Sequence, residues 1–365
     1  MALSERDLPR MLAGFGVAAD APPVRQGGGH INDSYVVTGR GPAGPGRFLL
    51  QRLNPSVFPD GLAVIANAAR VSAHLAAAAR AESGTPWRVP EPLRSDDGVP
   101  GRRDADGAWW RVFPWLEGVR AIERVTTAAE ARAVGRAFGH FHALLADFPG
   151  PPLAETLPGF HDTPARLAAL ERAVAATPSG RTHEAAPELG FVEAHRDWAT
   201  LLPAADLPVR VVHNDAKAGN VLLDAESGEP VAVIDLDTVM PGTLLHDVGD
   251  LIRSGASTAA EDAAGDAPVD IHPGQFRGLV EGFAAGLGPV RLAPAERAGL
   301  VAAGLVITFE QGLRFLADHL GGDRYYRISR PGQNLDRARV QFRLAAALAA
   351  ARPGLEVTVA GIFGA

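Results

Sequence analysis

The order of apolar and polar positions predicts a small mixed lobe at the beginning of the chain. Apolar and polar residues alternate up to Val37, and a second strand-like run, FLLQRLN, begins at Phe48. The glycine- and proline-rich segment between them, residues 39–46, predicts the turn of a hairpin. Residues 60–80 are alanine-rich with apolar side chains at helical spacing, and WWRVF, which ends at Phe113, predicts another strand. Strands, one helix and further strands make a small α+β lobe.

The pattern changes after this strand, where PWLEG, residues 114–118, leads into helical sequence. Thr127 and Glu130 have the T-x-x-E form of a capping box at the start of a long run with helical spacing. Residues 293–320 and 334–352 are also helical by this criterion. We therefore expect two lobes, residues 1–115 and residues 116–365.

Two kinds of segment interrupt the helical second half. The runs NVLLD and VAVIDLD are rich in β-branched residues and are separated by AESGEP, which predicts a β-hairpin. Proline- and glycine-rich segments around residues 149–164 and 178–190 predict loops.

Composition narrows the class of protein. A chain of 365 residues exceeds what one hydrophobic core usually organises. The net charge is −7 and the arginines are scattered among acids, which disfavours a nucleic-acid partner. No cysteine is present, so disulfides, thiol catalysis and cysteine-bound metals are excluded. We recognise neither a secretory signal nor an uninterrupted span of membrane length, and expect a cytoplasmic protein without a membrane partner.

The chemistry is concentrated in HNDAKAGN, residues 213–220, which contains Lys217, the only lysine of the chain. Asp215 and Asn220 have the spacing of the catalytic loop H-x-D-x-x-x-x-N of protein kinases. In such a loop the carboxylate accepts the proton of the attacking hydroxyl, and the amide oxygen holds a metal ion. Asp235 ends the second strand of the predicted hairpin, which would bring a further metal-binding carboxylate beside Asn220.

Each part of this pattern has an ordinary structural explanation. A motif as short as HxDxxxxN can arise by chance, and an aspartate after an apolar strand is commonly a turn former. The pair of motifs joined by a hairpin of suitable length favours phosphoryl transfer. We expect His213 to pack and to hydrogen-bond the backbone rather than to transfer protons.

Longer stretches carry a family resemblance. The segments are GGHINDSYVV, LLQRLN followed by VF, HNDAKAGNVLLD, VIDLDTVMPG, HDVGDLIR, STAAEDA and FEQGLRFLADHLGGDRYY. Across nearly the whole chain, from residue 27 to about 345, the sequence resembles the aminoglycoside phosphotransferase and choline kinase-like superfamily. More narrowly, it is similar to the N-acetylhexosamine 1-kinases.

The resemblance implies a two-lobed, protein-kinase-like α+β fold with a small β-rich N-lobe and a large helical C-lobe. It implies ATP and Mg²⁺, and transfer of the γ-phosphoryl group to the anomeric hydroxyl of a hexose, with an N-acetylhexosamine as the first choice of sugar acceptor. By similarity Asp215 is the base, Asn220 and Asp235 are metal ligands, and Lys217 contacts a phosphate. The backbone from Phe113 to Trp115 would meet adenine.

The nucleotide grip departs from the protein-kinase pattern. Protein kinases place a lysine on the third strand of the small lobe and pair it with a helix glutamate, but this chain has no lysine left for that position. Arg52 is the natural substitute, although the helix over residues 60–80 has no acid in its interior. Gly28 and Gly29 would let backbone amides approach a phosphate, or they serve only as a hairpin turn.

Candidates for acceptor binding lie in both lobes. Glu310 and Arg314 are one helical turn apart in an otherwise apolar segment, and either face a pocket or form an ordinary surface ion pair. The resemblance favours Arg314, with His30 and Asp33 reaching over from the small lobe, as contacts to hydroxyl and acetamide groups. Tyr325 is a weaker candidate.

Two other functions are also consistent with the sequence. One alternative is an aminoglycoside or other small-alcohol phosphotransferase, for which the acidic stretch over residues 261–270 could attract a cationic acceptor. The same stretch is equally consistent with a solvated loop. Another alternative is a nucleotide-binding pseudokinase, against which the presence of Asp215, Asn220 and Asp235 argues.

Overall fold

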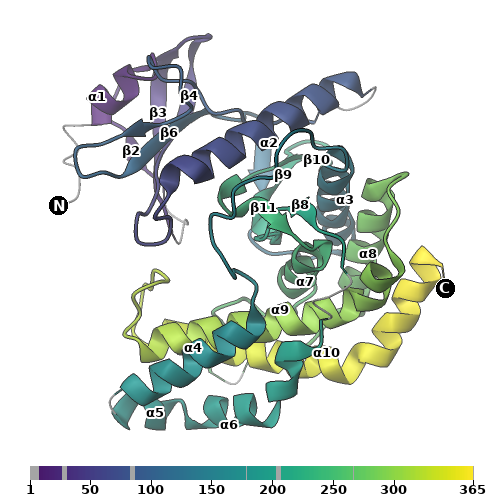
Figure 1. The fold of residues 1–365 in the computed structure, drawn as a ribbon. Coiled ribbons are helices and arrows are strands. Elements are labelled where there is room, and N and C mark those ends of the chain that lie inside the picture. The colour runs from purple at the N-terminus through teal and green to yellow at the C-terminus, as the bar shows by residue number, and fades with distance from the viewer. Residues whose placement is uncertain are drawn as a thin grey trace.

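The computed structural model describes residues 8–26, 31–82, 87–177, 179–202, 207–265 and 267–364. Within them the chain forms a small, sheet-based lobe above a larger helical lobe, as Figure 1 shows. This is the two-lobed α+β architecture that the resemblance predicted.

An antiparallel sheet forms the small lobe. Its strands are ordered β1-β3-β4-β6-β5, and β2 pairs with the free part of β3. The bounds are β1 Ala18–Ala19, β2 Val24–Arg25, β3 Asp33–Gly41, β4 Gly44–Arg52, β5 Arg102–Arg103 and β6 Trp109–Pro114. The predicted hairpin of β3 and β4 is confirmed, but its strands continue into the glycine-rich segment and leave only two residues for the turn. Within β3, position 39 requires glycine, because a Cβ at Gly39 would lie 2.2 Å from the carbonyl oxygen of Ala18 in β1.

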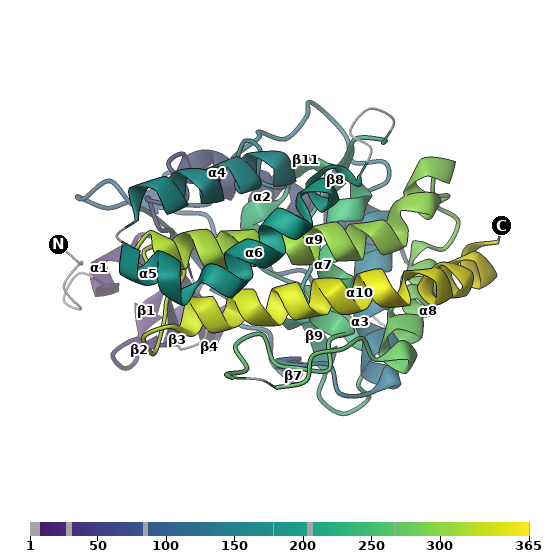
Figure 2. The same cartoon turned by 90° about the horizontal axis from the view of Figure 1, so that it is seen from below.

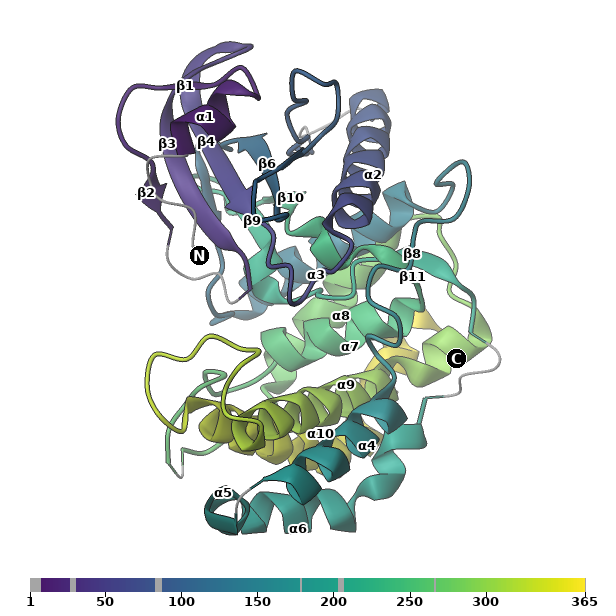
Figure 3. The ribbon, with the colours of Figure 1, turned by 60° about the vertical axis from the view of Figure 1, so that its left-hand side comes forward.

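Two helices accompany this sheet. Helix α1, Leu8–Ala13, packs into the apolar core of the small lobe through Leu8 and Leu12. Helix α2, Gly61–Ala81, begins at an N-cap aspartate, Asp60, and reaches the large lobe. Its buried Asn67 donates hydrogen bonds to the carbonyl oxygens of Ala154 (2.8 Å) and Val239 (3.1 Å). Helix α2 therefore connects the lobes, as Figure 3 shows.

The β-structure of the large lobe carries the segment of interest. The predicted hairpin is confirmed as β9, Val221–Asp224, paired with β10, Pro230–Val233. Strand β7, Val119–Ala121, follows the turn after β6 and pairs with β9, which the sequence pattern did not indicate. Strand β8, Arg210–Val212, pairs with β11, Met240–Gly242, and so closes the region at its base.

Helices make up the remainder, with α9 at the centre. Helix α9 packs against α10, α7 and α4, and Figure 2 shows α4, α9 and α10 side by side. The bounds are α3 Ala128–Leu144, α4 Thr163–Ala176, α5 Ser179–Glu184, α6 Ala186–Ala194, α7 Leu244–Gly255, α8 Pro273–Leu287, α9 Pro294–Leu320 and α10 Gln333–Phe363, with 3₁₀ turns η2 Arg196–Thr200, η3 Ala218–Asn220 and η4 Leu236–Thr238. Helices α5 and α6 occupy the region predicted as a loop, because Pro187 lies in the first turn of α6, where proline costs no hydrogen bond.

The expectation that no segment reaches membrane length is wrong by length and composition. Helices α2, α9 and α10 are all long and apolar enough to cross a membrane. In α9, 83% of the most apolar window is buried inside the protein, so core packing accounts for that sequence. Only 17% of the corresponding window of α10 is buried, and this window is rich in alanine.

Candidate active site

Strand pairing brings the predicted catalytic and metal-binding residues together. The HNDAKAGN segment follows β8, and the hairpin β9–β10 returns the chain to it. The amide nitrogen of Ile234 donates to the carbonyl oxygen of Asn220 at 2.9 Å. Asp235 is the next residue, so Asn220 and Asp235 lie at the same end of the hairpin.

Two residues of the same segment, Lys217 and Asn220, hold the side chain of Asp215. Its Oδ2 accepts from Lys217 Nζ at 2.6 Å and from Asn220 Nδ2 at 3.0 Å. Burial alone would raise the pKa of Asp215, but the Lys217 ammonium and the Asn220 amide hold it well below its usual range. For Lys217 the directions are reversed. Burial alone would lower its pKa, but the negative charges of Asp215 and Asp235 outweigh burial and raise the pKa. The pair is therefore ionised at neutral pH.

Asp235 differs from Asp215 in conformation and in proton affinity. It has a left-handed backbone (φ 66°, ψ 59°), as has Asn214 (φ 61°), the residue before Asp215. Desolvation and the charge of Asp237 raise the pKa of Asp235 to about 6, although its side chain is exposed at the lobe junction. Asp215 raises the pKa further and Lys217 opposes it, so these three charges act on one another.

The donor set fits a magnesium ion. The amide nitrogen of Asn220 is used by Asp215, which leaves its oxygen for a cation beside the carboxylate of Asp235. Among the described residues, no three His, Cys, Asp or Glu side chains form a metal-binding group. Mg²⁺ is commonly held by one or two protein oxygens together with water and phosphates, so two oxygen ligands are sufficient.

A buried carboxylate, that of Asp247, binds the backbone at the start of the HNDAKAGN segment. Asp247 accepts from the amide nitrogens of His213 (2.8 Å) and Asn214 (2.7 Å), and it lies 2.9 Å from His142 Nε2. His213 Nε2 lies 2.9 Å from the carbonyl oxygen of Ile234, and its Nδ1 accepts from the amide nitrogen of Asp215 at 3.3 Å. His213 therefore packs and hydrogen-bonds the backbone, as expected, and it contacts the amide of Asp215.

Arg52 lies away from this group. Its Nε donates to Asp104 Oδ2 at 3.3 Å, and Trp110 Nε1 donates to the same oxygen at 2.8 Å. Arg52 is paired with Trp110 across β4 and β6, so its side chain is on the face that forms the small lobe's core. Arg52 is therefore paired, and its acidic partner, Asp104, lies outside α2.

The segment predicted to meet adenine, Phe113 to Trp115, lies at the end of β6. The amide nitrogen of Trp115 donates to the carbonyl oxygen of Arg47 at 2.9 Å, and the Arg47 guanidinium stacks on the Trp115 ring. Phe113 lies on the opposite face of β6 from the core residue Val112. Gly28, Gly29 and His30 lie outside the described residues.

The two charged residues of α9 take different partners. Glu310 has only 1% of its side chain exposed; its oxygens lie 2.9 Å from His161 Nδ1 and accept from Thr163 Oγ1 at 2.7 Å. The alternative explanation, an ordinary surface ion pair between Glu310 and Arg314, is not found among the described residues. Arg314 instead stacks on Phe160, with its guanidinium carbon 4.6 Å from the ring centroid.

The loop between α9 and α10 supplies the remaining acceptor candidates. Arg314 also lies 5.9 Å from the ring centroids of Tyr325 and Tyr326 in this loop. Asp33, at the start of β3, forms ion pairs with Arg25 and with Arg327 of the same loop. Figure 3 shows the loop on the side where β3 approaches the large lobe. Asp33 of the small lobe thus contacts the loop of the large lobe that carries Tyr325.

Sequence reasoning missed two residues of this region, Arg111 and His161. Arg111 is a buried arginine of β6 that forms an ion pair with Asp237 in the other lobe. Its signal was a cation inside the apolar run WWRVF. His161 lies in a segment predicted as a loop, and both ring nitrogens face acceptors, Glu310 and the carbonyl oxygen of Asn214 (3.0 Å). Nothing in the local sequence indicated this contact.

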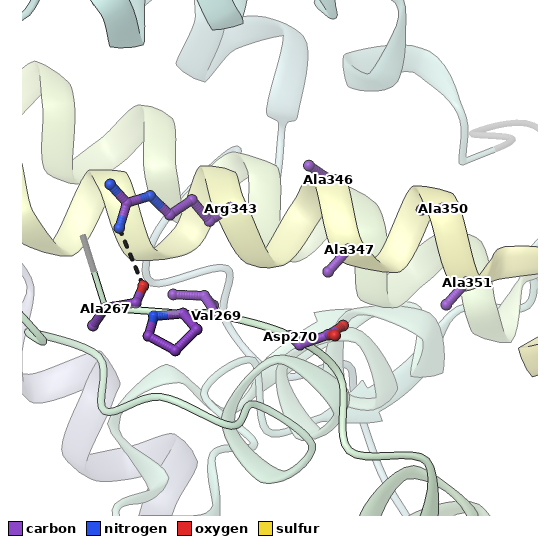
Figure 4. Close-up of a pocket in the computed structure, with 9 residues that line it drawn as sticks. Ala267, Val269, Asp270, Arg343, Ala346, Ala347, Ala350 and Ala351 are labelled. Atoms are coloured by element: carbon purple, nitrogen blue, oxygen red, sulfur yellow. Dashed lines mark hydrogen bonds between the residues drawn. The ribbon is translucent and has the colours of Figure 1, made fainter.

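A groove of about 740 Å³ lies elsewhere, and Figure 4 shows it. It is formed by residues 267–270 and by an alanine-rich face of α10 that carries Arg343. It contains none of the predicted site residues and brings no reactive groups together, so we do not assign the chemistry to it.

Solved structures share this architecture. A microcompartment-associated aminopropanol kinase aligns over 98% of this chain and 100% of its own, with a TM-score of 0.57 and 17% identity. A choline/ethanolamine kinase family protein from Mesorhizobium loti aligns over 99% and 98% (TM-score 0.55, 18% identity). A spectinomycin phosphotransferase, solved with ADP and spectinomycin, aligns over 97% and 99% (TM-score 0.56, 12% identity). At these identities the likeness concerns the fold.

The family follows from the sequence match. The model of the APH phosphotransferase enzyme family matches residues 24–280, which include Asp215, Asn220 and Asp235. The match extends over more than half of the chain and includes both strands of the catalytic hairpin. The chain therefore belongs to the APH family of phosphotransferases, enzymes that transfer a phosphoryl group to an alcohol.

Proposed function

We propose that this protein is an ATP-dependent, Mg²⁺-requiring kinase that phosphorylates the anomeric hydroxyl of a neutral hexose, such as an N-acetylhexosamine. The family supports phosphoryl transfer to a small alcohol, and the ADP complex of a structural neighbour supports ATP as donor. The resemblance to N-acetylhexosamine 1-kinases supports the sugar. A cytoplasmic location stays a prediction.

The observation that carries the choice of a neutral acceptor is the charge beside Asp215. Arg314 is close enough to Asp215 for their charges to interact, and Arg166 stacks on the same Phe160 ring at 5.9 Å. The nearby carboxylate of Glu310 is already neutralised by His161. Two guanidinium groups and a neutralised acid disfavour a cationic acceptor.

The acidic residues after α7 do not add negative charge that would favour a cationic acceptor. Glu261 accepts from Arg253 Nη1 at 2.8 Å, and Asp262 accepts from Gln333 Nε2 at 2.9 Å. These acids are used to hold the loop to α7 and α10. We therefore favour the structural explanation of this stretch over attraction of a cationic aminoglycoside.

The geometry supports a mechanism based on alignment. Asp215 would accept the proton of the anomeric hydroxyl, which is the most acidic hydroxyl of a reducing sugar, so a carboxylate with a low pKa is an adequate base. Lys217 would neutralise charge on the transferred group. Asn220 and Asp235 would hold Mg²⁺, which when bound neutralises phosphate charge.

An ADP-release assay over an acceptor panel tests this proposal. The panel contains N-acetylglucosamine, N-acetylgalactosamine, glucose, ethanolamine, choline and an aminoglycoside. We expect release with at least one N-acetylhexosamine and none above background with the three amines. Release with an amine and with no sugar would contradict the proposal, and no release with any acceptor would favour a pseudokinase.

A further inference from the structure

Arg111 is a buried arginine whose charge faces the junction of the lobes. Only 2% of its side chain is exposed. It lies opposite Gln51 across β4 and β6, whereas Arg52 lies opposite Trp110. Because neighbouring residues of a strand point to opposite faces, Arg111 lies on the face away from the small-lobe core, and Arg52 lies on the core face.

The contacts of Arg111 place it between two predicted parts of the nucleotide site. Its Nε and Nη2 donate to Gln51 Oε1 at 3.1 and 2.9 Å, and Nη2 forms the ion pair with Asp237 of η4. Its guanidinium carbon lies 5.0 Å from the Phe113 ring centroid. Phe113 begins the segment predicted to meet adenine, and Asp235 is two residues from Asp237. The phosphates of a nucleotide must cross this interval.

One nitrogen of Arg111 remains without an acceptor. Nη1 is buried and has no hydrogen-bond partner among the described residues. An unpaired donor on a buried charged group is costly, and such a group in a binding region indicates an acceptor that joins later. Arg111 pairs with Asp237, and its charge also acts on Asp235, so a polyanionic ligand bound beside these carboxylates requires the cations that the site can supply.

We infer that Arg111 is the small-lobe cation that binds the phosphates of the nucleotide, the role that sequence reasoning assigned to Arg52. Gln51 and Asp237 hold the guanidinium in place, which leaves Nη1 free to donate to a phosphate oxygen without rearrangement. This inference rests on the proposed function, because it requires that the protein bind ATP.

Nucleotide binding tests the inference without an acceptor. ADP and ATP are titrated calorimetrically in the presence of Mg²⁺, and adenosine is titrated by ligand-observed NMR, for wild type, Arg111→Gln and Arg52→Gln. We expect Arg111→Gln to weaken ADP and ATP by about 10- to 100-fold and to leave adenosine unchanged. For Arg52→Gln we expect the ratio of ATP to adenosine affinity to stay at the wild-type value.

Three outcomes would overturn the inference. An equal loss for adenosine, ADP and ATP in Arg111→Gln would mean that Arg111 only connects the lobes. A phosphate-dependent loss in Arg52→Gln instead would assign the role to Arg52. If wild type bound none of the ligands, both the inference and the proposed function would fail. The first two outcomes, in contrast, overturn only the role of Arg111 and leave the proposed function intact.

A charge-preserving variant covers the case in which Arg111→Gln does not fold. Arg111→Lys keeps the ion pair with Asp237 but offers a point charge in place of a planar fork. We expect a smaller loss that is confined to ADP and ATP. A loss that also affects adenosine to the same degree would again contradict phosphate binding.

Discussion

Asp215 is the residue on which the proposed chemistry depends. Asp215→Asn keeps the shape of the side chain and removes the proton acceptor, so we expect kcat to fall by about 10²- to 10⁴-fold while the dissociation constant for ADP stays close to wild type. Steady-state rates and calorimetry measure the two quantities. The control Asp106→Asn changes an exposed aspartate of the small lobe and should leave both unchanged. Full activity of Asp215→Asn would refute the assignment of the base.

Lys217 donates to Asp215 through its ammonium, and the charge of Asp235 also favours the charged form of Lys217. Lys217→Arg retains the charge but replaces a compact donor by a planar fork, which does not fit the same short contact. We expect kcat to fall roughly tenfold, a milder loss than that of Asp215→Asn. Single-turnover rates at saturating ATP provide the measurement. An unchanged rate would mean that the only lysine of the chain has no catalytic part.

His161 gives the acceptor side a measurable pH dependence. Burial lowers the pKa of His161, but Glu310 outweighs burial and the net shift is upward. A raised pKa means that the ion pair stabilises the fold fully below about pH 6.5 and that this contribution is lost as pH rises through the folded-state pKa. We therefore expect His161→Gln to lose more unfolding free energy at pH 6 than at pH 9, measured by urea denaturation. A loss of equal size at both values would contradict a charged His161.

Glycines set the distance between two helices of the large lobe. A Cβ at Gly282 of α8 would lie 2.1 Å from the carbonyl oxygen of Arg132 in α3, and one at Gly135 of α3 would lie 2.1 Å from that of Leu279 in α8. The neighbouring atoms are backbone, so they cannot yield by changing a rotamer. Helix α3 also carries Phe138, which packs edge-on against His213. The spacing of α3 and α8 thus bears on the catalytic segment.

We expect Gly282→Ala to lower the free energy of unfolding by about 2–3 kcal/mol, because the helices must separate. The matched control is Gly354→Ala in α10, where a Cβ meets nothing within 4 Å. There alanine should stabilise the helix by roughly 0.5–1 kcal/mol. Thermal and urea unfolding of both variants provide the comparison. A neutral Gly282→Ala would show that the two helices can separate without cost.

Elements with a local signal could be predicted, and those that depend on distant partners could not. The hairpin β9–β10 and helices α2 and α3 follow from periodicity, glycine and capping residues. Strand β7 has three residues and exists because β9 offers an edge. Helix α10 continues past Pro353 to Phe363, although proline usually ends a helix.

At the scale of the whole molecule, the site lies where several links join the lobes. Asn67 of α2 bonds to the carbonyl oxygen of Val239, Arg111 pairs with Asp237, and Asn32 donates to the same carboxylate at 2.6 Å. All three links end within five residues of Asp235. A change in the relation of the lobes would therefore act on the segment that contains Asp235 and Asp237.

This arrangement explains why the sequence indicated only part of the site. Asp215, Asn220 and Asp235 are joined by one hairpin, so their spacing predicts that they lie together. Arg111 and Arg52 differ by which face of the sheet they occupy, and that depends on the register of β6 against β4. His161 meets Glu310 across 149 residues, a contact that only the packing of α9 creates.

The most direct test of the account is the position of the transferred phosphate. The protein is incubated with ATP, Mg²⁺ and the most active N-acetylhexosamine, and the product is examined by ³¹P NMR. The account predicts a phosphate monoester signal coupled to the anomeric proton, which is absent when Asp215→Asn replaces the wild type. A phosphate coupled to another sugar proton, or a monoester formed only from an amino alcohol or an aminoglycoside, would contradict it.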